Sequence, residues 1–118
     1  MAIQLATTRQ TVCNAYVALG TWIGTATGSP GTTSTPSNES TGGSPAYARK
    51  QTTWTPSSGG VNNGSAVTID VPASTIAYIL LASAATVGAG NMIDWSDVTD
   101  IVFSAQGQAV VSPVMTVT

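Results

Sequence analysis

Short apolar runs separated by turn-forming residues limit the fold of this chain more than any other feature. Residues 65–71 alternate between apolar and polar, which places Val67, Ile69 and Val71 on one face of a half-buried strand. Residues 75–83 are almost all apolar, as in a strand that is buried on both faces. Further strands are expected over 21–27, 46–54, 91–95, 98–104 and 108–118. The predicted fold class is mainly β, as an antiparallel β-sandwich or small barrel.

One short N-terminal helix is predicted over residues 8–19. Apolar residues repeat there at helical spacing, from Val12 to Leu19, and Gly20 is expected to end the helix. Arg9 lies on the polar face. A helix this short is unstable alone and must pack on something. Two placements stay open: the helix covers one end of its own domain, or it is an arm that reaches a neighbouring subunit.

The chain is long enough for one domain with its own core, so residues 1–118 are expected to form a single β-rich domain. Its parts are a helix or arm and first strand (1–27), a Ser/Thr/Pro/Gly-rich loop (28–45) and the sandwich core (46–118). Pro113 suggests an edge position or a bulge in the last strand. The core is predicted from aromatic and branched residues: Trp22, Trp54, Tyr78, Ile79, Leu81, Ile93, Ile101 and Phe103.

Charged residues make up only 7 % of the chain, against about 25 % in an ordinary globular protein. Three basic residues cannot neutralise many phosphates, so nucleic acid is not an expected partner. No apolar run approaches the roughly 20 residues of a membrane-spanning helix, and no secretory signal is visible. The single cysteine, Cys13, is expected to be a buried small hydrophobe, which is consistent with synthesis in a reducing cytoplasm.

The chain has no histidine, so the commonest general base and metal ligand are missing. Asp94, Asp97 and Asp100 lie within seven residues and either bind a hard cation or form a solvated turn. We expect no enzyme activity, no cofactor and no metal. Six Tyr and Trp residues leave a sugar-stacking platform, and hence a carbohydrate-binding module, as an alternative.

Residues 38–54 contain the string Gly-Gly-Ser-Pro-Ala-Tyr-Ala-Arg-Lys followed by Trp54. This block, together with residues 71–75 and 103–108, resembles a family of short virion proteins of tailed phages of actinobacteria. Members of that family are usually labelled minor capsid, minor tail or tail fibre protein. The resemblance spans roughly residues 38–118 and implies a place in a virion rather than a reaction, because the family has no established catalytic residues.

The expected function is therefore that of a structural protein that decorates the phage head and stabilises the shell. The expected partners are the major capsid protein, further copies of this chain, or both. The alternative is a minor tail or tail-fibre protein that contacts the host surface.

Interfaces favour Tyr and Arg, so Tyr47 and Arg49, on one face of a predicted strand, are the first candidates for a partner contact. Another interpretation makes Arg49 and Lys50 one ion-paired and one solvated charge. The remaining candidate contact residues are Thr41, Gly42, Gly43 and Arg9.

Overall fold

The computed structural model describes residues 2–118 and contains one helix and nine strands. The helix is α1 (Ala6–Val17). The strands are β1 (Trp22–Ala26), β2 (Lys50–Gln51), β3 (Trp54–Pro56), β4 (Val61–Gly64), β5 (Val67–Val71), β6 (Ser74–Ala82), β7 (Met92–Phe103), β8 (Gly107–Val111) and β9 (Val114–Thr116). Among residues 2–118 all strand pairs are antiparallel and the sheets remain open, which confirms a mainly β, sandwich-like fold with one short N-terminal helix.

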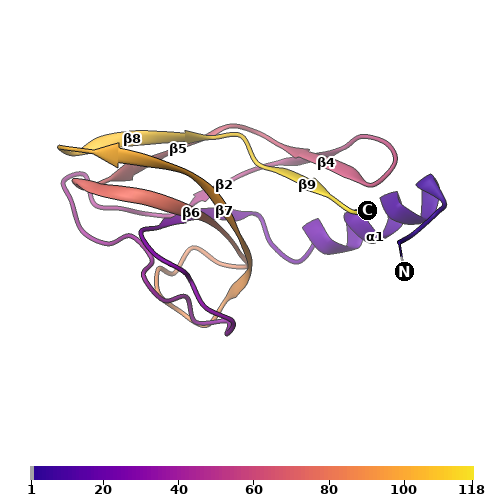
Figure 1. The fold of residues 1–118 in the computed structure, drawn as a ribbon, viewed down its shortest axis with the longest axis horizontal. Coiled ribbons are helices and arrows are strands. Elements are labelled where there is room, and N and C mark those ends of the chain that lie inside the picture. Colours follow the sequence, from indigo (N-terminus) through magenta and orange to yellow (C-terminus); the bar gives the residue numbers. More distant parts are fainter. Residues whose placement is uncertain (1) are drawn as a thin grey trace.

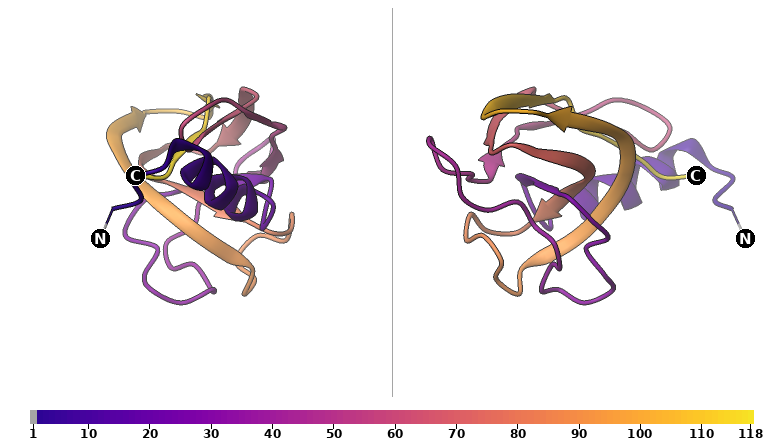
Figure 2. Two further views of the ribbon diagram at one scale, coloured as in Figure 1. Left: turned by 90° about the vertical axis from the view of Figure 1, so that its right-hand side faces the viewer. Right: turned by 60° about the vertical axis from the view of Figure 1, so that its left-hand side comes forward.

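The strands form three sheets in two layers (Figures 1 and 2). A four-stranded sheet in the order β2-β1-β6-β7 makes one layer, and the β5-β8 pair lies over it. A third sheet, β3-β4-β9, continues the upper layer toward α1. The molecule is elongated, 46 Å by 25 Å by 23 Å, with α1 at one end and the β7–β8 turn at the other.

The core has two parts, one on each face of the four-stranded sheet. Alternation in β5 does bury Val67, Ile69 and Val71, which pack with Ile23 and Ile76 between the layers. On the other face, a smaller cluster is formed by Ala26, Leu80 and Met92. This arrangement explains why β6 is nearly continuously apolar, as predicted, because its residues contribute to both clusters.

The predicted strand bounds are wrong in three places. The segment expected as one strand over 46–54 is reduced to β2 and β3, because Tyr47 N–H closes a turn on the Gly42 carbonyl instead of joining a ladder. The two strands expected over 91–104 are one bent strand, β7, which keeps its pairing to β6 through register shifts. Ile101 lies near the end of β7 and is 47 % exposed, so its placement in the core is also wrong. The single last strand expected over 108–118 is two strands, β8 and β9, which belong to different sheets, and Pro113 lies between them.

Helix α1 packs on β4 of its own chain, but not through the face that its sequence suggests. Cys13 and Val17 are buried, while Val12 and Leu19 are exposed. The polar side turns inward because β4 offers unpaired backbone groups: the Gln10 carboxamide oxygen accepts hydrogen bonds from the N–H groups of residues 60 and 61 at 3.0 and 3.1 Å. The helix therefore covers one end of its own domain.

The loop over residues 28–45 lies against the lower face of the four-stranded sheet (Figure 1). It is fixed there by side chains and backbone groups of β7: the Trp95 indole N–H donates to the Gly31 carbonyl at 2.8 Å, and Met92 N–H donates to the Ser34 carbonyl at 2.9 Å. Within residues 2–118, no helix is both long enough and apolar enough to cross a membrane.

Candidate interaction surface

Tyr47 and Arg49 do not form the exposed partner contact that was predicted for them. Their exposed fractions are 6 % and 2 %, and both side chains are engaged within the chain. The prediction is wrong because the strand that was to display them is a bent segment, which turns both side chains under β1. Lys50, the next residue, is half-buried and has no ion-pair partner among residues 2–118.

Arg49 forms a two-pronged ion pair with Glu39. Arg49 Nε lies 2.7 Å from Glu39 Oε2, and Nη2 lies 2.8 Å from Oε1. The Tyr47 hydroxyl donates to Glu39 Oε2 at 2.8 Å and accepts from Thr25 N–H at 3.0 Å. Gly24 of β1 packs directly against this network, and a Cβ at that position would collide with the Tyr47 hydroxyl. A residue without a side chain is therefore required there.

The network also ties the loop before β7 to the loop before β2. Gly88 N–H donates to Glu39 Oε1 at 2.7 Å, and Arg49 Nη1 donates to the Ala84 carbonyl at 2.9 Å and to the Asn91 side chain. Every buried side-chain nitrogen and oxygen within residues 2–118 has a hydrogen-bond partner. The network is thus complete in itself and holds the fold together.

Burial alone would raise the pKa of Glu39, but the hydrogen bonds from Arg49, Gly88 and Tyr47 and the charge of Arg49 outweigh it and hold that pKa below its ordinary value of 4.5. The pKa of Tyr47 is raised, mainly by burial and then by the negative charge of Glu39. Glu39 thus stays ionised and the Tyr47 hydroxyl stays protonated at neutral pH. Sequence reasoning missed Glu39, although it is the only glutamate in the chain and lies ten residues before Arg49.

The other predicted contact residues separate into two places. Thr41, Gly42 and Gly43 are exposed, as a partner contact requires, and lie at the β7–β8 end of the molecule. Gly42 and Gly43 have φ of +82° and +93°, so the turn requires glycine. Arg9 lies at the opposite end, where its guanidinium donates to the carbonyls of residues 3, 4 and 59 at 2.7–3.0 Å. These four residues do not form one site.

Three connections meet at the β7–β8 end, which we call the corner end: residues 42–46, 72–73 and 104–106. Residues 72–73 join β5 to β6 and residues 104–106 join β7 to β8. These two connections lie side by side because β6 pairs with β7 and β5 pairs with β8, which places Ser74 opposite Phe103 and Val71 opposite Gly107. Gln106 binds the third connection to residues 42–46. Its side-chain oxygen accepts a hydrogen bond from Ser44 N–H at 3.2 Å, and its side-chain nitrogen donates to the Pro45 carbonyl at 3.1 Å. Segments far apart in the sequence therefore make one structural unit.

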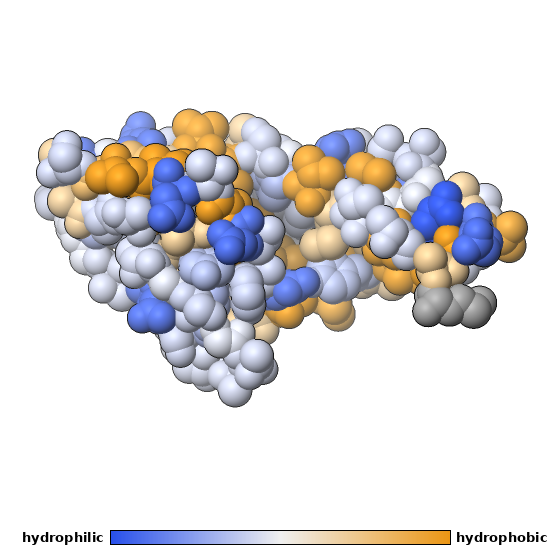
Figure 3. Space-filling model, in the orientation of Figure 1, coloured by the Kyte–Doolittle hydropathy of each residue, from blue (hydrophilic) through white to orange (hydrophobic). Residues whose placement is uncertain are grey.

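Large apolar side chains are exposed on the strands that lead into and away from the corner end. Val102 of β7 is 74 % exposed and Val110 of β8 is 68 % exposed. Ile101 and Val114 are 47 % and 59 % exposed. Figure 3 shows hydrophobic residues over β8 and again over β9, with residues of intermediate hydropathy between them. Exposed apolar side chains gathered in one part of a surface are typical of an interaction surface.

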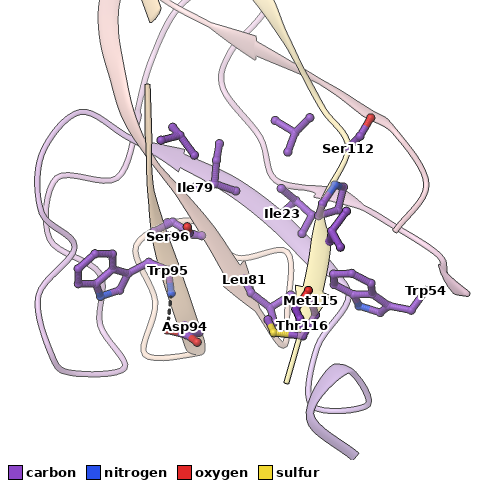
Figure 4. A pocket seen from close by; sticks show the side chains of 15 residues that line it. Ile23, Trp54, Ile79, Leu81, Asp94, Trp95, Ser96, Ser112, Met115 and Thr116 are labelled. Carbon is purple, nitrogen blue, oxygen red and sulfur yellow. Dashed lines mark hydrogen bonds between the residues drawn. The ribbon is translucent and has the colours of Figure 1, made fainter. Parts of the chain in front are cut away.

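A groove of about 460 Å³ opens between β7 and the β8–β9 segment (Figure 4). Its floor is apolar and includes Ile23, Ile79 and Leu81. One wall is β7, with Asp94 and Ser96, and the other runs from Val111 to Thr116. Sequence patterns could not predict this groove, because its two walls come from different layers of the sandwich.

The three aspartates of β7 are exposed and do not converge on one point. Asp94 accepts a hydrogen bond from the Tyr16 hydroxyl, which links β7 to α1. Burial and this hydrogen bond raise the pKa of Tyr16. Within residues 2–118, no group of three His, Cys, Asp or Glu side chains is close enough to hold a metal ion.

The aromatic side chains do not form an exposed platform in the described part of the chain, since every Trp and Tyr is buried or half-buried. Trp95 stacks edge-to-face on Tyr78, with ring centroids 5.3 Å apart. Trp54 donates its indole N–H to the Gly20 carbonyl at 3.0 Å. The sugar-stacking alternative thus gains no support from the geometry.

Comparisons with protein-family models, with curated proteins and with solved structures give no match.

Proposed function

We propose that this protein is a non-enzymatic structural component of a tailed-phage virion, which decorates the head and stabilises the shell. The proposal begins with the resemblance of three sequence blocks, residues 38–54, 71–75 and 103–108, to short virion proteins of actinobacterial phages. The fold supports it by the way it arranges these blocks.

The observation that carries the proposal is that parts of all three blocks meet at the corner end. Residues 71–75 contain the β5–β6 connection and residues 103–108 contain the β7–β8 connection. Gln106 binds Ser44 and Pro45 of the first block. Segments distant in sequence that share a resemblance and also share a location are expected to serve one purpose, and an exposed end of a small β-domain is suited to contact with a partner.

The exposed apolar side chains beside the corner end provide a driving force for that contact. Covering a largely exposed valine such as Val102 or Val110 yields about 1 kcal/mol. The chain adds little electrostatic repulsion between copies, because its formal net charge is only −2. Weak contacts of this kind become effective when many copies bind a repetitive shell.

The test is re-addition of the purified protein to heads that lack it, with bound protein measured after sedimentation. Val102→Asp should bind much more weakly than wild type, because a carboxylate would be buried at the contact. Val12→Asp is the matched control, because Val12 is an exposed valine on α1 at the far end. Equal binding by both variants and wild type would refute the corner end as the contact. Wild-type protein that fails to bind any head would refute the decoration role.

A further inference from the structure

The groove between β7 and the β8–β9 segment lies away from the corner end and has the shape of a site for an extended chain. It is open to solvent, its floor is formed by β1 and β6, and its walls are strands from two layers (Figure 4). Its apolar floor residues Ile79 and Leu81 remain accessible from the groove, although they belong to the core. An occupant with apolar side chains would cover them.

Both walls are edge strands. Within the described residues, β7 pairs only with β6 and ends the four-stranded sheet, and β9 pairs only with β4 and ends the three-stranded sheet. An edge strand presents unpaired N–H and C=O groups, which an added strand can satisfy. Addition of an extended peptide to such an edge is a common mode of recognition, in which neighbouring pockets select the side chains.

Charge decides which occupant fits. The β7 wall carries Asp94, and Asp97 and Asp100 are exposed on the same strand. No lysine or arginine lines the groove. Three of the five acidic residues in the chain therefore lie on one edge strand. A basic segment is attracted to this edge and an acidic one is repelled.

A second copy of the chain is a poor occupant for the same reason. Two β7 strands paired across a twofold axis would bring six carboxylates together, three from each copy. The basic residues of the chain cannot compensate easily, because Arg49 is buried and Arg9 is bonded to three carbonyls. Like charges on paired strands are destabilising.

We infer that the groove binds an extended segment of a different protein, in which apolar side chains alternate with lysine or arginine. The segment adds as a strand along β7, its apolar side chains cover Ile79 and Leu81, and its basic side chains point to the opposite face, on which Asp97 lies. This site is separate from the corner end and does not depend on where the proposed virion contact lies.

The test is titration of the full-length protein with a short synthetic peptide of sequence Lys-Val-Thr-Val-Lys-Val-Thr, followed by calorimetry and by backbone amide NMR shifts. An otherwise identical peptide with glutamate in place of lysine is the control ligand. The lysine peptide should bind, shift amides of β7 and of residues 111–116, and bind at least about tenfold more weakly in about 1 M salt, where charge attraction is screened. The glutamate peptide should not bind.

Two variants separate the groove from the rest of the surface. Ser96→Trp places a bulky side chain in the groove at an exposed position and should abolish binding, whereas Ser58→Trp, in the β3–β4 turn, should not. Asp97→Asn with Asp100→Asn should weaken binding about tenfold, and Asp70→Asn, on β5, should leave it unchanged. Both sets of variants should melt like wild type.

Three results would overturn the inference: no binding of the lysine peptide, equal binding of both peptides, or binding that Ser96→Trp leaves intact. Dimerisation of the protein through β7, seen as concentration-dependent shifts of the same amides without peptide, would assign the groove to a second copy instead. None of these results bears on the virion role, which depends on binding to heads at the corner end.

Discussion

Arg49 and Glu39 form a bidentate ion pair whose side chains are 0 % and 3 % exposed. The chain has only three basic and five acidic residues, and one of each is placed inside the fold in this pair. The pair connects β2 to two loops that cover the lower face of the four-stranded sheet. The ion pair therefore holds these loops to the sheet from inside the fold, while most of the exposed surface is uncharged.

Removing one partner of this pair should be strongly destabilising. Arg49→Met leaves the Glu39 carboxylate buried without its counter-ion, for which we expect a loss of about 3–5 kcal/mol in the free energy of unfolding. Lys50→Met is the control, because Lys50 is half-buried and has no ion-pair partner in residues 2–118, and it should change stability by less than about 0.5 kcal/mol. Urea denaturation measures both, and similar losses in the two variants would contradict the role assigned to Arg49.

The ion pair should also make stability depend on pH. The pKa of Glu39 is lower in the folded chain than its ordinary value of 4.5, so folding favours the ionised form. The stability that this group contributes is therefore complete above pH 4.5 and is lost as the pH falls through the lower, folded-state pKa. The difference in unfolding free energy between wild type and Glu39→Gln should shrink on acidification below pH 4.5. A difference that is constant across this range would show that the carboxylate is not responsible.

The Tyr47 hydroxyl should contribute measurably. Tyr47→Phe removes the donor to Glu39 and leaves Thr25 N–H without its acceptor, so we expect a loss of about 1–3 kcal/mol. Tyr78→Phe is the matched control, since the Tyr78 hydroxyl makes no hydrogen bond within residues 2–118, and it should be close to neutral. Thermal unfolding of the two variants side by side makes the comparison, and equal melting temperatures would be inconsistent with the network as described.

Alanine substitutions of two isoleucines should show which of them belongs to the core. Ile69→Ala should cost about 2–5 kcal/mol, because Ile69 is fully buried between the layers. Ile101→Ala should cost less than about 1 kcal/mol, because Ile101 is 47 % exposed and its removal leaves no closed cavity. Chemical denaturation measures the free energy of unfolding of both variants. A large loss for Ile101→Ala would show that Ile101 contributes to the core after all.

The sequence predicts the strands whose burial is one-sided or complete, because the period of apolar residues records it directly. Val67, Ile69 and Val71 are on the buried face, as expected, and β6 is buried on both faces. The apolar period cannot show where a segment bends. For this reason the sequence wrongly predicts a strand over residues 46–49, with Tyr47 and Arg49 at a surface. Their partner Glu39 lies in a loop without any period, and only the tertiary fold brings it to Arg49.

The contacts at the two ends of the molecule could not be predicted from the sequence either, because they join segments that are far apart in the chain. Thr41, Gly42 and Gly43 are exposed, but the contact of the neighbouring Ser44 and Pro45 with Gln106 depends on how two distant turns meet. Arg9 was expected to face a partner, and instead it fixes the start of α1 to the β3–β4 turn. Long-range pairing of this kind leaves no local signature in the chain.

The most direct measurement of the proposed function is the number of copies of this protein in a purified virion, determined by quantitative mass spectrometry against the major capsid protein. A head-decorating role predicts copies comparable in number to the major capsid protein. A handful of copies per particle would move the protein to the tail or its tip, as in the alternative assignment. Complete absence from the particle would contradict the virion role itself.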